Sequence, residues 1–376
     1  MQRRTGVEIP EIELAIMEEA CERASVVPLV SVVVPCRNER KHIAMFLDAL
    51  DRQQEVTGGW EVIVADGASD DGTRTILDDY ARRNSKVRVC SNSGLIVSTG
   101  LNTAIREARG EIIVRMDVHT EYASNFLVEC VSVLKATGAD NVGGPTVARG
   151  NSFISRAIAT ASQCSFCMGG GRSHNPDYEG PVDTVFPGCW RRSTLLELGL
   201  FDERLVRNQD DELNLRLTRS GGTVWQSPRI ECWYSVRPTL STLFRQYSQY
   251  GFWKVAVIQK HRLPASFRHV VPGLFVFANL LLPLFAGSFL LAGGMSAVRD
   301  LLIAWATLWT IYLSASIAAA FQVTKGRDWK LFSLLPVVFA VYHFAYGFGF
   351  LHGMVHFVLR GKAGAKVPMW LTRLTR

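Results

Sequence analysis

Acidic residues follow strand-like runs at two distant points of this sequence. Asp66 comes directly after the run 60–65, and Asp117 comes after the run 111–116, with His119 two positions later. In an open α/β sheet, ligands bind outside the carboxyl ends of the strands, so two acidic strand ends can share one crevice. Carboxylates placed there indicate a cation and a phosphorylated ligand. A third acidic cluster, 209–212, could add a carboxylate base.

The segments that carry these residues alternate between strand and helix patterns. Expected strands lie at 29–34, 60–65, 87–90, 111–116 and 141–146, and expected helices at 41–53, 73–84, 98–108 and 124–137. Later come expected strands at 182–186 and 223–226 and helices at 192–198, 211–220 and 239–259. Such alternation predicts an α/β fold with a mostly parallel central sheet. The breaker-rich segment 167–180 is expected to form a loop.

The composition changes sharply along the chain. Of 376 residues 48% are apolar, and charges become scarce between 270 and 359. The segments 272–293, 301–321 and 331–359 are each long enough to cross a membrane, which takes roughly 20 residues. A buried hydrophobic helical domain is the alternative. The net charge of +7 would suit nucleic acid or an anionic membrane, and the apolar third favours the membrane; no nucleic-acid signature accompanies the charge.

Basic residues flank the third apolar segment on both sides. Lys325, Arg327 and Lys330 precede it, and a Lys- and Arg-rich tail follows residue 359. Both stretches favour a cytoplasmic location, and three full crossings cannot satisfy both. The third segment, which contains Gly347 and Gly349, is therefore a candidate for a re-entrant or interfacial helix.

We expect three regions. Residues 1–28 form an N-terminal extension with a short acidic helix at 11–21, residues 29–260 form the α/β domain, and residues 261–376 form a membrane-associated helical region. The N-terminus lacks the uninterrupted apolar core of a signal peptide. The eight cysteines form no framework; Cys164 and Cys167 have the spacing of a metal knuckle or redox pair, but no second pair accompanies them. Buried reduced thiols in a cytoplasmic domain are expected.

The first two strand ends carry specific motifs. Val34-Pro35-Cys36-Arg37-Asn38-Glu39 is followed about thirty residues later by Asp66-Gly67-Ala68-Ser69-Asp70. In this order the motifs resemble those of the family 2 glycosyltransferases, and the resemblance runs from about residue 31 to 254. It implies the nucleotide-sugar-binding GT-A fold, with Pro35, Asn38, Glu39 and Asp66 lining the uridine pocket of a UDP-sugar donor.

Asp117-Val118-His119 stands where the family usually has an Asp-x-Asp metal motif. The resemblance implies that Asp117 contacts the donor and that Asp117 and His119 hold a divalent cation, Mg²⁺ or Mn²⁺. Imidazole replaces the second carboxylate here. Mn²⁺ accepts both oxygen and nitrogen ligands, whereas Mg²⁺ prefers oxygen and keeps waters, so the departure weakens the match to the metal motif without abolishing it and leaves the preferred metal open.

The third acidic cluster, Gln209-Asp210-Asp211-Glu212-Leu213, resembles the family's Glu-Asp-x-Asp-Leu pattern. Asp210 falls on the position of the catalytic base, which takes the proton from the acceptor hydroxyl. In isolation, such an aspartate would more often be a helix cap.

The same resemblance implies the remaining candidates, which are expected to bind the acceptor. They are Asp211 and Glu212, Gly188 in the segment 182–192, and Gln246 and Trp253 in a Gln- and Arg-rich element. Trp253 could stack on a sugar, while Arg245 or Lys254 could offer a charge to a phosphate. His174, beside Arg172 in the glycine-rich loop, is a further candidate.

Within the family, the motifs and the apolar C-terminal segments most resemble bacterial enzymes that build succinoglycan-like exopolysaccharide. This implies inverting transfer of glucose from UDP-glucose to an undecaprenyl-diphosphate-linked saccharide at the bacterial inner membrane, with the catalytic domain facing the cytoplasm. Two rivals stay open. A processive polysaccharide synthase would favour more pore-forming helices and an intact Gln-x-x-Arg-Trp element, and a non-catalytic nucleotide-sugar-binding membrane protein would release no UDP.

Overall fold

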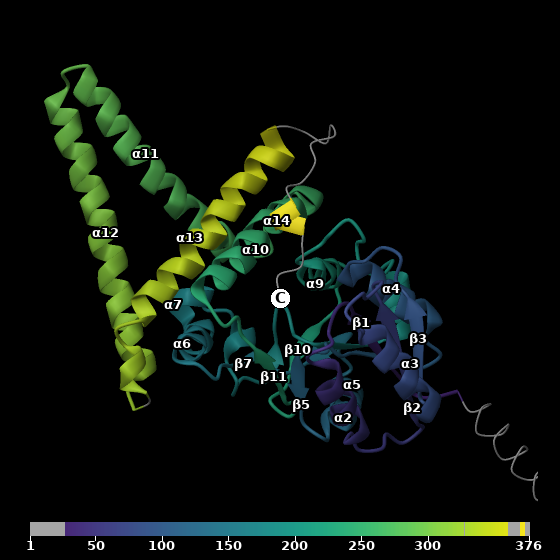
Figure 1. Ribbon diagram of the computed structural model, residues 1–376. Coiled ribbons are helices and arrows are strands. Elements are labelled where there is room, and N and C mark those ends of the chain that lie inside the picture. The colour runs from purple at the N-terminus through teal and green to yellow at the C-terminus, as the bar shows by residue number, and fades with distance from the viewer. Residues whose placement is uncertain (1–26, 327, 360–368, 373–376) are drawn as a thin grey trace, which may run out of the picture.

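The computed structural model describes residues 27–326, 328–359 and 369–372. An α/β domain carries an arm of long helices that extends away from it (Figure 1). The expected helix at 11–21 and most of the basic tail lie outside the described residues.

The centre of the α/β domain is an eight-stranded sheet with the order β3-β2-β1-β4-β9-β6-β10-β8. Its strands are β1 (Val30–Cys36), β2 (Trp60–Asp66), β3 (Val87–Ser91), β4 (Ile112–Arg115), β6 (Asn141–Gly143), β8 (Gly180–Pro181), β9 (Gly188–Arg191) and β10 (Val224–Gln226). β1, β2, β3 and β4 are parallel, and β9 runs antiparallel between β4 and β6. The predicted α/β fold with a mostly parallel sheet is confirmed.

Helices cover both faces of this sheet, because its central strands are apolar on both sides. Val32 and Val34 of β1 pack against α2 and α5, whereas Val33 packs on the opposite face against α4. This alternation follows from the two-residue period of a strand. The covering helices are α2 (Ile43–Asp51), α3 (Thr73–Arg83), α4 (Val97–Glu107), α5 (Phe126–Thr137), α8 (Arg192–Glu197) and α9 (Gln209–Arg219).

A second, three-stranded sheet was not predicted from the sequence. It consists of β5 (Thr120–Tyr122), β7 (Val147–Arg149) and β11 (Cys232–Ser235), with β11 in the middle. Strands this short carry too few residues to show a period. The strand expected at 182–186 is wrong. Apart from a bond from the Val182 amide to the Val224 carbonyl (3.0 Å), this segment leaves the sheet and lines a cavity, and the strand β9 begins only at Gly188.

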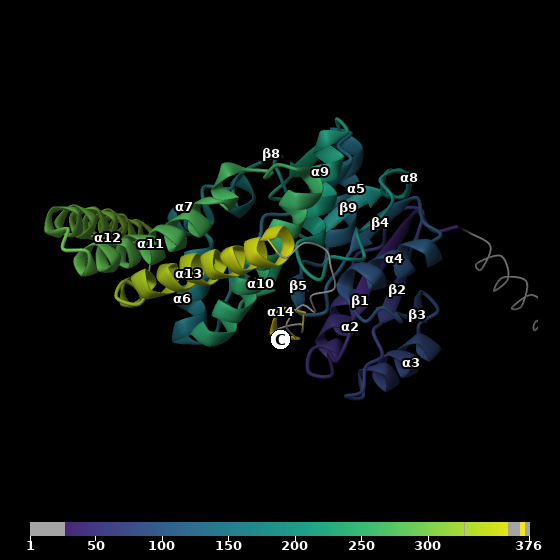
Figure 2. The same ribbon diagram turned by 90° about the horizontal axis from the view of Figure 1, so that it is seen from above.

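A layer of helices lies between the sheets and the apolar arm (Figure 2). It contains α6 (Phe153–Ser162), α7 (Ser165–Met168), the 3₁₀ turn η1 (Arg172–His174) and the long α10 (Leu240–His261). The arm follows through η2 (Phe267–His269), α11 (Val271–Leu291), α12 (Met295–Thr324), η3 (Trp329–Leu331), α13 (Leu335–Gly353) and the π-helical η4 (Met354–Leu359), and α14 (Met369–Thr372) is the last described element.

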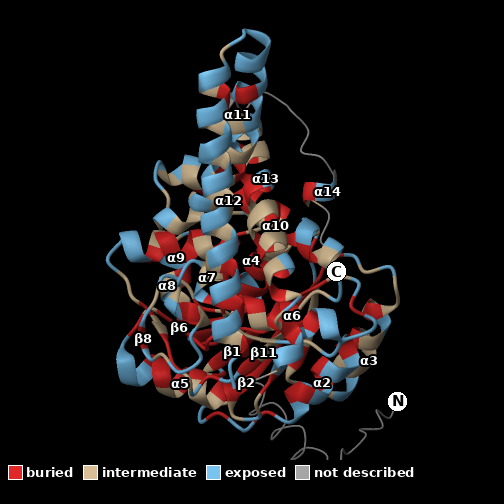
Figure 3. Cartoon of the chain, turned by 90° about the vertical axis from the view of Figure 1, so that its left-hand side faces the viewer, coloured by how far each residue is buried: buried red, intermediate tan, exposed pale blue. Residues whose placement is uncertain are grey.

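Three of these helices are long and apolar enough to cross a membrane, but they differ in exposure. Only 11% of the most apolar part of the first (Phe267–Leu291) and 6% of that of the second (Met295–Thr324) is buried, against 44% for the third (Leu335–Val358). α11 and α12 accordingly form an exposed hairpin, whereas α13 runs beside α10 (Figure 1, Figure 3). The domain boundary at residue 260 remains a prediction. α13, which follows this boundary, packs against α10, which precedes it.

Glycines allow the close approach of α10 and α13. A Cβ atom at Gly349 would lie 2.0 Å from the Ser248 carbonyl oxygen, and one at Gly251 would lie 2.0 Å from the Tyr346 carbonyl oxygen. Both positions face backbone atoms, which cannot rotate away as a side chain can. The two helices therefore touch backbone to backbone at these points.

Substituting Gly349 with alanine should loosen this contact. We expect overpacking to cost roughly 1–3 kcal/mol, which should lower the thermal unfolding midpoint of the detergent-solubilised protein by at least about 2 °C. Gly287→Ala in α11 is the matched control, because nothing lies within 4 Å of a Cβ there. An unchanged midpoint for Gly349→Ala would show that the helices separate without cost.

Candidate active site

The carboxyl ends of β1 and β2 are joined by side-chain hydrogen bonds. Asn38 adopts a left-handed backbone conformation (φ 54°), and its amide nitrogen donates to Asp70 Oδ1 at 2.9 Å. The Asn38 oxygen accepts from the Asp70 backbone (3.0 Å), and the Asn38 backbone donates to Ser69 Oγ (2.9 Å). Two loops that are distant in sequence thus form one rigid rim.

Asp66 lies at the centre of this rim. It is 3% exposed, accepts a hydrogen bond from Ser69 Oγ at 2.6 Å, and lies 3.8 Å from Arg74 Nη1. Glu39, which is also buried, has its backbone N–H fixed by Thr73 Oγ1 at 2.8 Å. The structure brings Asn38, Glu39 and Asp66 together at one sheet edge, and Pro35 from the same edge lines the cavity described next.

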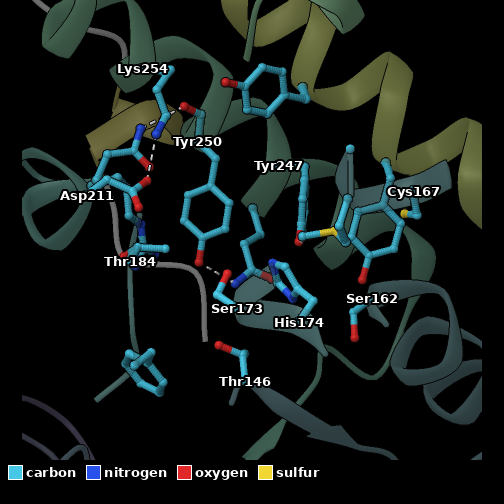
Figure 4. A pocket seen from close by; sticks show the side chains of 18 of the residues that line it. Thr146, Ser162, Cys167, Ser173, His174, Thr184, Asp211, Tyr247, Tyr250 and Lys254 are labelled. Atoms are coloured by element: carbon cyan, nitrogen blue, oxygen red, sulfur yellow. Dashed lines mark hydrogen bonds and ion pairs between the residues drawn. The ribbon is translucent and has the colours of Figure 1, made fainter. Parts of the chain in front are cut away.

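A cavity of about 810 Å³ extends from this edge to the apolar helices. Its lining includes Pro35, Asp117 and His119 from the strand ends, Asp210 and Asp211 from α9, and Gln246, Tyr250 and Lys254 from α10. Phe275 of α11, Tyr312 of α12 and Tyr342 of α13 also line it. Figure 4 shows part of this space, into which Asp211, Lys254, His174 and Tyr247 point. Of the polar residues predicted from the sequence, Asp117, His119, Asp210, Asp211 and Gln246 therefore share one cavity with residues of the apolar arm, whereas Asn38, Glu39 and Asp66 lie at the sheet edge and do not line it.

Arg115, which the sequence reasoning did not select, links two of the acidic groups. Its guanidinium donates to both oxygens of Asp117 at 2.9 Å, and its Nη1 lies 3.8 Å from Asp210 Oδ2. The pKa of Arg115 is raised by Asp117 and Asp210 despite burial, which opposes the charge. The one signal in the sequence was a charged residue inside a strand that is otherwise apolar.

His119 lies beside Asp117 and Glu39, and its Nδ1 is 3.7 Å from Glu39 Oε1. Burial lowers the pKa of this imidazole, and the nearby arginines add to the effect, while Asp117 partly opposes it. The neutral imidazole is the form that ligates metals. The part of the chain that the structure describes holds no group of three or more His, Cys, Asp or Glu side chains arranged for a metal.

The adjacent carboxylates of Asp210 and Asp211 have opposite environments. Burial and the charge of Asp211 raise the pKa of Asp210, with Arg115 opposing. Burial also acts to raise the pKa of Asp211, but Lys254, whose Nζ lies 2.6 Å from Asp211 Oδ2, holds it below its usual value. About a third of the Asp210 side chain (31%) stays exposed. A paired carboxylate beside one with a raised pKa is a common arrangement for a catalytic base.

Glu212 and Trp253 lie away from the cavity. Glu212 is fully buried and pairs with Arg216 (2.9 Å), Lys260 (2.8 Å) and His261 (2.9 Å), which ties α9 to the end of α10. Trp253 is 6% exposed and donates to the Leu371 carbonyl at 3.0 Å, beneath α14. Their acceptor roles remain predictions that this arrangement does not favour.

Gly188 belongs to β9 rather than to the cavity wall. A Cβ there would lie 2.3 Å from the Trp190 ring and 2.7 Å from Asn141 Oδ1, so glycine is required for packing. Thr184, Val185 and Phe186 from the same segment line the cavity instead.

Gln246 does line the cavity. Its amide nitrogen donates to the hydroxyls of Tyr234 (3.0 Å) and Tyr250 (2.9 Å), and its oxygen accepts from Arg237 Nε (3.2 Å). Arg237 and Arg207 line the same space, and neither was selected from the sequence. Burial lowers the pKa of Arg207, which also faces Arg237. Two half-buried arginines that face each other favour an anionic ligand.

The pH dependence of catalysis should report on the Asp210–Asp211 pair. A base must be ionised, so the rate should fall as the pH drops through the raised pKa of Asp210. Asp211→Asn removes the like charge, while Arg115 and Arg207 still face Asp210. The acid limb of kcat/KM should then move to lower pH, by up to about one unit. An unchanged or higher midpoint would exclude Asp210 as the group that titrates.

Known proteins share both the sequence and the fold. Residues 31–190 match the model of glycosyl transferase family 2. The succinoglycan biosynthesis protein ExoA of Rhizobium meliloti is 30% identical over 243 residues, which cover 64% of this chain and 73% of ExoA. The chain belongs to glycosyltransferase family 2. The predicted family and enzyme class are thereby confirmed.

Two further relatives match more of this family 2 glycosyltransferase. A dolichyl N-acetyl-α-D-glucosaminyl phosphate 3-β-D-2,3-diacetamido-2,3-dideoxy-β-D-glucuronosyltransferase of Methanococcus voltae is 24% identical over 87% of this chain and 97% of its own length. The mannosyltransferase PcManGT of Pyrobaculum calidifontis, solved with GDP-Man and Mn²⁺, superposes with a TM-score of 0.55 at 20% identity, covering 90% of this chain and 94% of its own. This similarity confirms the GT-A fold.

Proposed function

We propose that this enzyme transfers a hexose, glucose from UDP-glucose, onto a polyprenyl-diphosphate-linked saccharide in exopolysaccharide biosynthesis, with inversion. The observation that carries the proposal is the single cavity that joins Asp117, His119 and Asp210 to residues of α11, α12 and α13. A soluble acceptor would not require a cavity lined by membrane-helix aromatics. The similarity to ExoA and to a glycosyltransferase that acts on a dolichyl-linked sugar supports the choice of acceptor.

In this proposal the donor occupies the sheet edge. Asn38, Glu39 and Asp66 recognise the uridine with carboxylate and amide groups that their loops hold in place. The half-buried Arg207 and Arg237 face the diphosphate, whose negative charge offsets the repulsion between the two guanidinium groups.

The residues present fit a divalent cation bound together with the donor. Asp117 and a neutral His119 would hold it, and the phosphates and water would complete its shell, as Mg²⁺ sites with few protein ligands do. When bound, such a cation stabilises negative charge on the leaving diphosphate. PcManGT was solved with Mn²⁺, which supports this assignment.

Asp210 acts as the base. It accepts the proton of the acceptor hydroxyl, the acceptor oxygen forms a bond to the anomeric carbon, and the bond from that carbon to the UDP oxygen breaks. A single displacement inverts the anomeric configuration. Arg115 keeps Asp210 oriented and partly balances its charge.

We further propose that α11 and α12 cross the bacterial inner membrane as a hairpin while α13 lies at the cytoplasmic interface. α13 packs on α10, and Arg156 of α6 forms an ion pair with Asp328, just before α13. Both contacts hold the start of α13 against the catalytic domain. With only two crossings, the basic stretch before α13 and the basic tail after it lie on the same side, as the positive-inside rule requires.

A transfer assay tests the function. Membranes carrying lipid-linked precursors are incubated with the full-length enzyme and radiolabelled UDP-glucose, UDP-galactose or UDP-N-acetylglucosamine. We expect UDP release and addition of one labelled glucose to the lipid fraction. A ladder of long products would favour the processive synthase, and UDP-sugar binding without UDP release would leave only the binding protein.

The metal assignment leads to a separate prediction. His119→Asp should shift the preference of the enzyme from Mn²⁺ towards Mg²⁺, because an oxygen donor replaces nitrogen. Activity is titrated with each cation in wild type and variant, with Thr75→Asp as the control because Thr75 is exposed on α3 and does not line the cavity. The same ratio of activities in both proteins would mean that His119 is not a ligand.

A further inference from the structure

One wall of the cavity carries buried polar atoms that have no hydrogen-bond partner among the described residues. They are Ser173 Oγ and His174 Nδ1 of η1, His269 Nδ1 of η2 and Tyr346 Oη of α13. Buried polar groups in folded proteins are almost always hydrogen-bonded, so each exception requires an explanation. All four residues line the same cavity, and each of these atoms can donate a hydrogen bond. A ligand rich in acceptor oxygens would satisfy them together.

Cationic side chains surround the same wall. Lys254 and Arg268 line the cavity, and each is paired with one carboxylate, Asp211 and Asp183 respectively. A smaller adjoining hollow of about 460 Å³ shares both cations and adds Arg172. Asp211 and Asp183 are already paired with Lys254 and Arg268. The polar atoms of this wall that still have no partner are therefore hydrogen-bond donors. This composition selects an anion.

The glycine-rich loop is shaped around Arg268. Gly169 has a left-handed backbone (φ +67°), and a Cβ there would lie 2.8 Å from Arg268 Cβ. A side chain at position 169 would push the loop and Arg268 apart. The two glycines at positions 169 and 171 therefore let the loop before η1 approach η2, which brings His174 and Arg268 to one site.

An apolar lining begins beside this polar wall. Phe275 of α11 stacks on Tyr312 of α12 with ring centroids 4.7 Å apart, and Phe166 of α7 lies 5.7 Å from Tyr312. These rings line the same cavity as His174 and Tyr346. An anionic group and a long apolar chain can thus be bound side by side, at the junction between the catalytic domain and the helical arm.

We propose that the wall formed by Ser173, His174, Arg268, His269 and Tyr346 binds the diphosphate of the acceptor's lipid carrier, with the isoprenoid chain against the aromatic lining. This inference rests on the proposed function. It separates two anion sites: Arg207 and Arg237 face the donor diphosphate, and this wall faces the acceptor diphosphate. Asp210 lies in the cavity that they share, where the acceptor saccharide must reach the donor sugar.

Direct binding to the full-length protein in detergent tests the proposal. The probes are undecaprenyl diphosphate, undecaprenol, inorganic diphosphate and UDP. The variants are Tyr346→Phe, which removes one hydroxyl, and Arg268→Gln, which removes one charge. Tyr80→Phe is the control, because that hydroxyl already pairs with Asp51 in α2.

For undecaprenyl diphosphate we expect the Kd to rise about 3- to 10-fold in Tyr346→Phe and at least about 10-fold in Arg268→Gln. The Kd values for undecaprenol and UDP should stay within about twofold, which also shows that the variants are folded. Equal losses for UDP would assign the wall to the donor and overturn the proposal. Inorganic diphosphate binding as tightly as the lipid diphosphate would show a free-anion site and overturn it too. Since no transfer is measured, selective loss of lipid diphosphate would stand even if the enzyme did not use UDP-glucose.

Discussion

Replacing Asp210 with asparagine should remove nearly all transfer while leaving the affinity for UDP almost unchanged. The amide keeps the shape of the carboxylate but cannot take the proton of the acceptor hydroxyl. Losing a general base typically lowers the rate roughly 10²- to 10⁴-fold. The raised pKa of Asp210 fits this role, because a more basic carboxylate is a better proton acceptor. Initial rates of UDP release give kcat, and calorimetric titration with UDP gives the affinity.

Asp79→Asn in α3 is the control, since its ion pair with Arg82 is exposed and neither residue lines the cavity. That variant should retain wild-type kcat. Near wild-type transfer by Asp210→Asn would mean that the base is another group. A large loss of UDP affinity would instead show that Asp210 helps to bind the donor.

Replacing Arg115 with methionine should destabilise the folded protein as well as inactivate it. Arg115 is 4% exposed and Asp117 is 7% exposed, so the methionine variant leaves a buried carboxylate without its bidentate partner. Breaking a buried pair on one side typically costs about 3–5 kcal/mol. The thermal midpoint should therefore fall by roughly 6–20 °C. Thermal unfolding followed by tryptophan fluorescence in detergent measures this shift.

Two comparisons isolate the cause. Arg115→Lys keeps the charge but loses the paired hydrogen bonds, so its midpoint should lie between those of wild type and Arg115→Met. Arg82→Met breaks an exposed pair and should shift the midpoint very little. If Arg115→Met unfolded at the wild-type temperature, Asp117 would not depend on this arginine.

The positions of the proposed donor-binding residues could be predicted because these residues follow continuous apolar runs. The apolar runs before Cys36, Asp66 and Asp117 specify strands that are buried on both faces, and parallel strands end at one edge of the sheet. The register that pairs Cys36 with Asp66 then brings the two loops together. Strand pattern and topology suffice for this step, and no side-chain packing needs to be known.

The acceptor side could not be read in the same way, because a motif does not say which face of a helix each residue occupies. Asp210, Asp211 and Glu212 are consecutive on α9, and successive helical residues point about 100° apart. The first two face the cavity, and Glu212 turns inward to Lys260 and His261. Trp253 lies about two helical turns beyond Gln246, on nearly the same face of α10, yet α14 covers it.

The sequence by itself determined the family 2 motifs, the parallel sheet, the apolar segments and the residues Asp66, Asp117 and Asp210 at their strand and helix ends. Only the tertiary structure decided which charges meet. Arg115 bridges Asp117 and Asp210, and His174, Arg268 and Tyr346 line one cavity although they come from three separate segments. Local patterns specify local structure because they depend on neighbours in the chain. The polar wall depends on glycine contacts and helix packing between distant segments, which no local pattern encodes.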